Sequence, residues 1–203
     1  MSNFKFHNLF PTTILSTILN NIDKNDINLY QNYFSGKEYN NTPNEGMYSK
    51  NNRVLEHHVF NKLKNEILKF SKLYLNNLGH VFEDIQIGSS WVNILNKNNT
   101  IKLHQHTNSY ISGVFYLNSS SSLIFDNPLI SKWFFSSMVK KDKNNFCTFN
   151  DFEFKPSSKE LILFPSFLYH KVIPSDTDNR ISLAFNIIPK GEFGGDTQKL
   201  YLK

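Results

Sequence analysis

From residue 80 onward the chain is divided into short runs of strand-forming residues. Turn-forming residues such as Asn96–Asn99, Pro156–Ser158 and Asp176–Asn179 separate these runs, which recur roughly every ten residues. This spacing is typical of a β-sandwich or barrel. The predicted strands are Phe82–Ile87, Ser90–Leu95, Ile101–His106, Ile111–Leu117, Leu123–Phe125, Phe146–Phe154, Glu160–Phe164, His170–Ile173 and Arg180–Ile187.

The clearest helix of the sequence precedes these strands. Apolar residues at three- and four-residue spacing predict an amphipathic helix over 54–75, and Gly79 supplies a stop signal after it. Earlier in the chain, residues 4–19 predict an edge strand. The polar stretch 20–52 predicts loop around a short helix near 27–34.

A helix ahead of about eight antiparallel strands favours a mainly β fold, a double-stranded β-helix (jelly roll) with an N-terminal helical extension. The length of 203 residues suits a single domain, residues 1–203. Within it we expect residues 1–79 to form the N-terminal strand and helical support, and residues 80–190 to form the jelly-roll core.

Charge and composition exclude several classes of partner. The formal net charge is +5, but the lysines are scattered and Asp142 interrupts the densest group, so there is no strong nucleic-acid signal. No apolar run approaches the ~20 residues that cross a bilayer, and the N-terminus lacks the features of a signal peptide. The single cysteine, Cys147, forms no internal disulfide and fits a reducing compartment. We therefore expect a cytoplasmic protein without a membrane partner.

Two histidines in the middle of the strand region point to a metal. His104 and His106 are two residues apart in a predicted strand, so both imidazoles project from one face. His170, after an apolar run some sixty residues later, is a third candidate ligand. The alternative is that such an alternating pair faces solvent, and the H-x-H pattern by itself is a weak signal.

Residues downstream of His170 add a second kind of site. Arg180 and Ser182 lie two apart, on one face of the last predicted strand. Arginine binds a carboxylate through two parallel hydrogen bonds, and a neighbouring hydroxyl adds another. An arginine pointing into an apolar barrel is costly unless an anion meets it. The pattern therefore predicts a carboxylate receptor beside the histidines.

These motifs together resemble a known enzyme family. H-x-H at 104–106, followed by SGVFYLN, LFPSFLYHKV and RISLAFN, is similar to the core of the 2-oxoglutarate/iron(II)-dependent oxygenases. The most similar group is the one common in marine phages and bacteria. The resemblance also includes LFPTTIL near the start, the 54–75 helix and the SSWVNIL strand, so it covers most of the chain.

The resemblance implies a role for each matching residue. His104 corresponds to the first iron ligand and His170 to the distal one. Arg180 corresponds to the residue that pairs with the far carboxylate of 2-oxoglutarate, and Ser182 completes the R-x-S pattern. Tyr116 corresponds to a tyrosine that reaches the same carboxylate in related prolyl hydroxylases; the alternative for Tyr116 is a core aromatic.

His106 departs from the family pattern. The superfamily usually has Asp or Glu at this position. Three neutral histidines can hold iron(II), as in cupin dioxygenases. Two other possibilities are a two-histidine site completed by water and a carboxylate from elsewhere, with Asp126 as the nearest candidate. The departure leaves open whether the protein hydroxylates, carries out other oxidation chemistry or is inactive.

The resemblance implies a 2-oxoglutarate-dependent non-haem iron dioxygenase, a hydroxylase that couples decarboxylation of 2-oxoglutarate to oxidation of a substrate. Its cofactors would be Fe(II) and 2-oxoglutarate, and its compartment the cytoplasm, that of the host if a phage encodes it. One alternative is a non-catalytic jelly-roll binding or structural module. Another is a cupin-like three-histidine metalloenzyme without a co-substrate. The substrate, a small molecule or a protein side chain, would be selected by the loops at 20–52 and 127–150.

Overall fold

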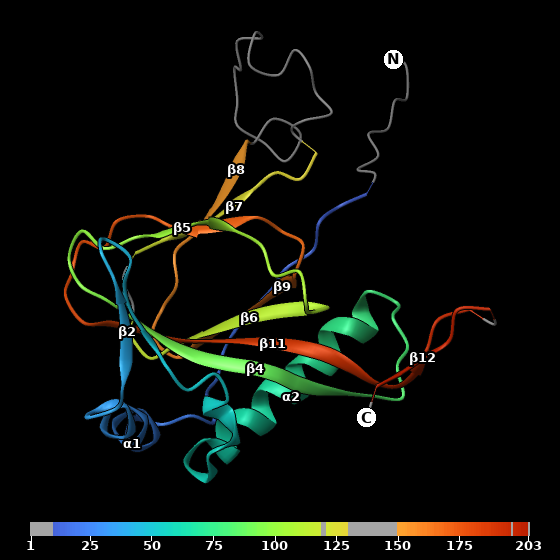
Figure 1. Cartoon of the computed structure of the whole chain (residues 1–203), viewed down its shortest axis with the longest axis horizontal. Helices are drawn as coiled ribbons and strands as arrows, with labels where there is room; N and C mark the ends of the chain where they lie inside the picture. The colour runs from blue at the N-terminus through green and yellow to red at the C-terminus, as the bar shows by residue number, and fades with distance from the viewer. Residues whose placement is uncertain (1–9, 119–120, 130–149, 196, 203) are drawn as a thin grey trace, which may run out of the picture.

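The computed structural model describes residues 10–118, 121–129, 150–195 and 197–202, and these build two antiparallel sheets that face each other (Figure 1). The larger sheet has the order β1-β9-β6-β11-β4-β3-β2, and β12 pairs with β11. Its strands are β1 (Leu15–Ile18), β2 (Tyr39–Thr42), β3 (Gly46–Ser49), β4 (Asp84–Leu95), β6 (Ile111–Tyr116), β9 (Glu160–Pro165), β11 (Arg180–Phe193) and β12 (Leu200–Leu202). The smaller sheet, β5-β10-β7-β8, comprises β5 (Ile101–His104), β7 (Leu123–Asp126), β8 (Asp151–Phe154) and β10 (His170–Val172).

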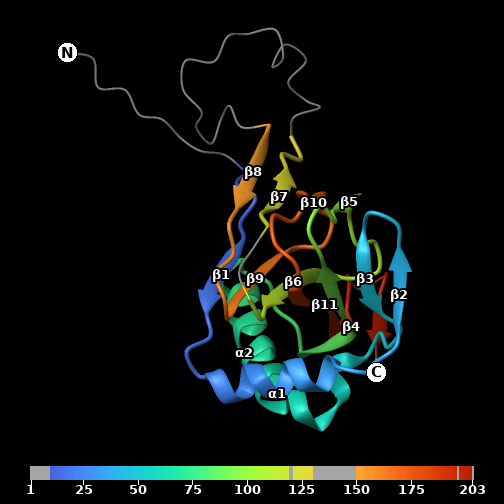
Figure 2. The same cartoon turned by 90° about the vertical axis from the view of Figure 1, so that its left-hand side faces the viewer.

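Helices cover the outer face of the larger sheet (Figure 2). They are α1 (Lys24–Phe34) and α2 (Asn61–Asn77), and two short 3₁₀ helices, η1 (Val54–Glu56) and η2 (His58–Phe60), precede α2. The predicted mainly β jelly roll with an N-terminal helical extension is therefore confirmed. No helix in the described part of the chain is long and apolar enough to cross a membrane.

Strand periodicity divides β11 between two environments. Ile181, Leu183 and Phe185 point outward and join a core cluster with residues of α2 such as Leu63 and Ile67. The alternate residues of β11 face the smaller sheet, and they are Arg180, Ser182, Ala184 and Asn186. The inward face of β11 therefore carries polar groups into the space between the sheets.

The structure differs from the predicted elements in several places. The two strands expected over 82–95 form one strand, β4, because β11 pairs with it along almost its whole length. A hairpin, β2–β3, forms in the stretch expected to be loop, because β3 gains a partner in β4. The helix predicted from residue 54 begins with the two 3₁₀ turns, so α2 proper starts at Asn61.

Some predicted features lie outside the described residues. These are Cys147, the first part of the edge strand over 4–19, the first part of the strand over Phe146–Phe154, and most of the 127–150 loop.

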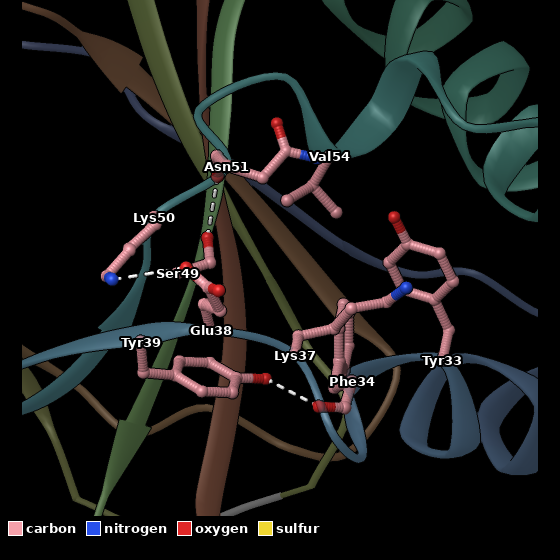
Figure 3. A pocket seen from close by; sticks show the side chains of 9 residues that line it. All are labelled: Tyr33, Phe34, Lys37, Glu38, Tyr39, Ser49, Lys50, Asn51 and Val54. Carbon is pink, nitrogen blue, oxygen red and sulfur yellow. Dashed lines mark hydrogen bonds and ion pairs between the residues drawn. The ribbon is translucent and has the colours of Figure 1, made fainter.

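A pocket of about 210 Å³ lies where α1 meets the β2–β3 hairpin (Figure 3). Several of its polar groups have partners within the chain. Lys50 forms an ion pair with Glu38 at 3.1 Å, and the Tyr39 hydroxyl donates to the Phe34 carbonyl at 2.9 Å. The Lys37 ammonium lies 4.4 Å from the centre of the Tyr33 ring. These contacts tie the hairpin to α1, and we assign no ligand to this pocket.

Candidate metal centre

His104 and His170 form a cross-strand pair in the smaller sheet. His104 ends β5 and His170 begins β10, and the two residues are directly opposite in the antiparallel register. Opposite residues project from the same face, and the two ring centres lie 4.3 Å apart. The fold therefore joins two histidines that are far apart in the sequence.

His106 reaches the same place from a loop. The strand predicted over 101–106 ends at His104, so the alternation of a strand does not orient His106. Its backbone N–H instead donates to the Ser166 carbonyl at 2.9 Å, which fixes the loop against the turn before β10. The His106 ring lies 5.1 Å, centre to centre, from each of the other two rings.

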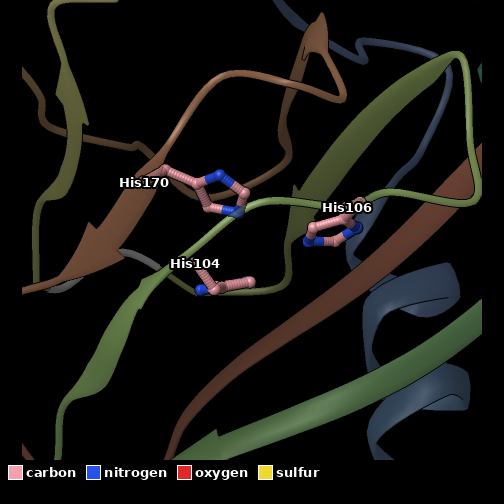
Figure 4. Close-up of side chains that lie close together, drawn as sticks. All are labelled: His104, His106 and His170. Carbon is pink, nitrogen blue, oxygen red and sulfur yellow. The ribbon is translucent and has the colours of Figure 1, made fainter.

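The three histidines together have the arrangement of a metal site (Figure 4). Their candidate ligand nitrogens all lie within 4.8 Å of one another. Two nitrogens bound to one ion at about 2 Å are at most ~4 Å apart, so small side-chain rotations would close the set on a metal. Among the described residues the cluster contains these histidines and no carboxylate, so the fold does not bring Asp126 into it.

Hydrogen bonds define which nitrogen of each imidazole is free. His104 Nδ1 lies 2.8 Å from the Lys102 carbonyl, and His170 Nδ1 lies 2.8 Å from the Leu168 carbonyl. A carbonyl oxygen only accepts, so each Nδ1 carries the proton and each Nε2 keeps its lone pair. Metal-binding histidines commonly have this second contact.

Burial keeps two of these imidazoles neutral. Desolvation lowers the pKa of His170 to about 3, although its bond to the Leu168 carbonyl opposes the shift. Desolvation also lowers the pKa of His106. His106 and His170 are therefore neutral nitrogen donors at neutral pH, which suits iron(II) and other divalent first-row metals.

A buried cation lies on the inner face of β11. Arg180 is only 1% exposed, and no acidic residue forms an ion pair with it in the described part of the chain. Within the described residues, its Nη1 makes a long contact of 3.3 Å with the Ser182 hydroxyl, and its Nε has no hydrogen-bond partner. Burial lowers the pKa of Arg180, which reflects the cost of a desolvated charge. Pairing with an anion would offset this cost.

Tyr116 completes the surroundings of this guanidinium. The Arg180 Cζ lies 5.2 Å from the centre of the Tyr116 ring, and Tyr116 is opposite Ser182 in the strand register. The Tyr116 hydroxyl is buried and lies near the guanidinium without a well-formed hydrogen bond. Burial raises its pKa to about 12, so it stays protonated and can donate. An anion here would meet a guanidinium and two hydroxyls.

The metal cluster and the buried cation share one interior. The His170 ring packs on Phe164 at 4.7 Å and on Phe125 at 6.1 Å, centre to centre. Both phenylalanines belong to the core cluster that contains Tyr116. The histidines therefore lie at one part of the space between the sheets, and Arg180 faces into the same space.

Two residues that the sequence did not assign contact His106. The Asn186 Oδ1 lies 2.6 Å from His106 Nδ1, and the Trp91 ring lies 5.6 Å from the His106 ring, centre to centre. Both residues are on the inner face of the larger sheet, where Asn186 shares the β11 face of Arg180 and Ser182. That shared periodicity is the only local signal that could have pointed to Asn186.

A second pocket, of about 400 Å³, borders the metal cluster through His106. It opens between the end of α2, the loop that follows His106 and the turn before β10. Among the described residues, its wall contains no Asp, Glu, Lys or Arg. The lining residues are Leu78, His80, Gln105, His106, Thr107, Ser109, Tyr110, Ile111, Pro165 and Phe167.

The central part of the chain is similar to one known family. Residues 89–186 match the model of a family described as "Putative 2OG-Fe(II) oxygenase". The matched span runs from β4 to Asn186 and includes the three histidines, Tyr116, Arg180 and Ser182. No curated protein matches the chain.

Solved structures of low sequence identity share the architecture. The alpha-ketoglutarate-dependent epimerase SnoN from nogalamycin biosynthesis is 10% identical, with a TM-score of 0.64 over 91% of this chain and 82% of that one. HygX from Streptomyces hygroscopicus, solved with nickel and 2-oxoglutarate, is 12% identical, with a TM-score of 0.60 over 88% and 83%. A Pseudomonas putida prolyl-4-hydroxylase is 13% identical, with a TM-score of 0.58 over 89% and 94%. At these identities the similarity establishes the shared fold.

Proposed function

We propose, from the match of residues 89–186 to a family described as "Putative 2OG-Fe(II) oxygenase", that the chain is an iron(II)- and 2-oxoglutarate-dependent non-haem dioxygenase. The observation that carries the proposal is the combination of a three-histidine cluster with a buried, unpaired arginine in one interior. The histidines provide the metal ligands, and the arginine provides a receptor for the co-substrate.

In this proposal, His104, His106 and His170 hold iron(II) through their Nε2 atoms. Arg180 pairs with the far carboxylate of 2-oxoglutarate, and the Ser182 and Tyr116 hydroxyls supply further hydrogen bonds to it. Bound iron and 2-oxoglutarate supply oxygen activation coupled to decarboxylation, which yields succinate, carbon dioxide and an oxidised substrate. The surrounding apolar side chains exclude water from the reacting groups.

The protein's own contribution is orientation and electrostatics. The cross-strand pair His104–His170 holds two ligands on a rigid sheet. The desolvated guanidinium of Arg180 interacts with a carboxylate far more strongly than an exposed one would. The neutral ligand set leaves the positive charge of the ion uncompensated, which favours an anionic co-substrate at the metal.

The two alternative functions lack an explanation for part of this interior. A cupin-like three-histidine metalloenzyme has no use for the buried Arg180 beside Tyr116 and Ser182. A non-catalytic binding or structural module has no use for three imidazoles whose candidate ligand nitrogens lie within 4.8 Å of one another. The oxygenase accounts for both features with one reaction.

An anaerobic titration tests the proposal. Addition of 2-oxoglutarate to the protein with iron(II) is expected to produce a weak visible charge-transfer band, because the keto acid chelates the metal. Iron binding without the band would favour the three-histidine metalloenzyme without a co-substrate. No iron binding would favour the non-catalytic module.

We propose that the substrate enters through the pocket beside His106 and that the part near the metal is uncharged. The pocket shares His106 with the metal cluster, so a molecule inside it lies next to the ion. Tyr110 and Phe167 offer apolar surface, and Gln105 and Thr107 offer hydrogen bonds. A buried charge without a partner would be costly against such a wall. A neutral small molecule or a neutral protein side chain fits this surface.

Proton relaxation of three related probes tests the charge preference. Phenol, benzoate and benzylamine share a ring and differ in charge. With manganese(II) in the protein and saturating 2-oxoglutarate, phenol is expected to relax fastest, because only it enters the pocket close to the metal. Zinc-loaded protein is the diamagnetic control, and Phe167→Ala should reduce the effect on phenol. The proposal would be contradicted if manganese(II) enhanced the proton relaxation of all three probes equally, or if it enhanced the relaxation of none of them.

Three coarser features complete the proposal. Residues 1–203 form one domain, in which residues 1–79 support a jelly-roll core over 80–190. The enzyme works in the cytoplasm, or in the host cytoplasm if a phage encodes it. These features rest on the mainly β architecture and on the single cysteine.

A further inference from the structure

Asn186 contacts the one candidate ligand histidine whose ring is not hydrogen-bonded to a main-chain carbonyl. His104 and His170 each place Nδ1 against a carbonyl of the main chain. His106 Nδ1 instead lies 2.6 Å from the side-chain Oδ1 of Asn186. Among the three candidate ligands, only His106 depends on another side chain for the position of its proton.

The neighbouring strands determine the orientation of the Asn186 amide. Asn186 is opposite Ser112 of β6 and Ser89 of β4 in the strand register, so all three side chains share the inner face. The Ser112 hydroxyl donates to Asn186 Oδ1 at 2.8 Å and the Ser109 hydroxyl at 3.3 Å. On the other side, Asn186 Nδ2 donates to the Ser89 hydroxyl at 3.0 Å. The amide oxygen therefore points toward His106.

Buried serines support this arrangement further. Ser112 and Ser166 are each 1% exposed, and their hydroxyls lie 2.8 Å apart. Ser109 also contacts Ser166, whose carbonyl accepts the backbone N–H of His106. One polar network thus holds both the backbone and the ring of His106.

We infer that Asn186 is the positioning residue of the third metal ligand. Its amide oxygen accepts the Nδ1 proton of His106 and leaves the Nε2 lone pair for the metal. The inference rests on the proposed metal site and deepens it. It explains how a neutral histidine, His106, is oriented at the position where the superfamily usually has a carboxylate ligand. The hydrogen-bond acceptor that orients His106 is the side-chain amide of Asn186, which lies on β11.

Cobalt(II) binding to the whole protein, followed by its visible absorption, tests the inference. Asn186→Leu removes the acceptor and is expected to lower the affinity about 10- to 100-fold, the usual cost of losing such a partner. Asn186→Asp keeps an acceptor oxygen and should bind cobalt at least as tightly as the wild type. Rescue by Asp but not Leu separates positioning from packing.

Asn118→Leu is the matched control. Asn118 is also half-buried, and it also makes hydrogen bonds in both directions, to the Asn179 carbonyl and from the Ile181 N–H. It contacts no histidine. This variant should lose stability without losing cobalt affinity.

The position of the proton on the His106 ring gives a second readout that needs no metal. In the metal-free protein, nitrogen-15 NMR is expected to place the His106 proton on Nδ1, and in Asn186→Leu to move it toward Nε2. A wild-type His106 protonated on Nε2, or an Asn186→Leu variant with wild-type cobalt affinity, would overturn the inference alone. If His170→Leu left cobalt binding unchanged, the proposed metal site would fail, and this inference with it.

Discussion

Arg180→Ala is expected to weaken 2-oxoglutarate binding by about 2–5 kcal/mol, the range for removing one partner of a buried charge pair. The guanidinium is 1% exposed and has no acidic partner among the described residues, so a bound carboxylate would be its only counter-charge. Iron affinity without the co-substrate should not change, because a guanidinium is no metal ligand. Calorimetry with iron(II) and with 2-oxoglutarate in the absence of oxygen measures both quantities.

Arg180→Lys is the conservative control. An ammonium restores the charge but lacks the planar pair of donors, so it should recover only part of the lost affinity. If Arg180→Ala bound 2-oxoglutarate as tightly as the wild type, the carboxylate receptor would lie elsewhere. If the wild type bound no 2-oxoglutarate, the proposed co-substrate would be wrong, and only a metal-binding jelly roll would be supported.

His170→Leu is expected to abolish tight iron binding. It removes one of the three ligands, and the loss should exceed the 10- to 100-fold that follows removal of a mere supporting contact. Leucine is the suitable replacement because His170 is 4% exposed and packs on Phe164 and Phe125. Alanine would leave a cavity there and confound the loss of metal with a loss of stability.

The free energy of unfolding separates the two effects. Metal-free His170→Leu should be at least as stable as the metal-free wild type, because burying a neutral imidazole is itself costly. His58→Leu, at an exposed position on the 3₁₀ turn before α2, is the control and should bind iron normally. Unchanged iron affinity in His170→Leu would remove that histidine from the metal site.

The strands of the core and the inward face of β11 illustrate what local sequence could determine. Alternation with period two is a property of consecutive residues, and it correctly placed Arg180 and Ser182 on one face. The same periodicity predicted most strands of the core, because half-buried strands need it. It missed the β2–β3 hairpin, whose polar residues show no such alternation and whose pairing with β4 is a long-range contact.

The histidine cluster illustrates what only the tertiary structure decided. The sequence nominated His104 and His106 as neighbours on one strand, but β5 ends at His104 and a loop carries His106 to the cluster. The pairing of His104 with His170 depends on the register between β5 and β10. That register cannot be read from the sequence of either strand alone. The acceptor for His106 comes from β11, eighty residues later. Strand periodicity is local and can be read from the chain, whereas register and loop path depend on how the two sheets pack.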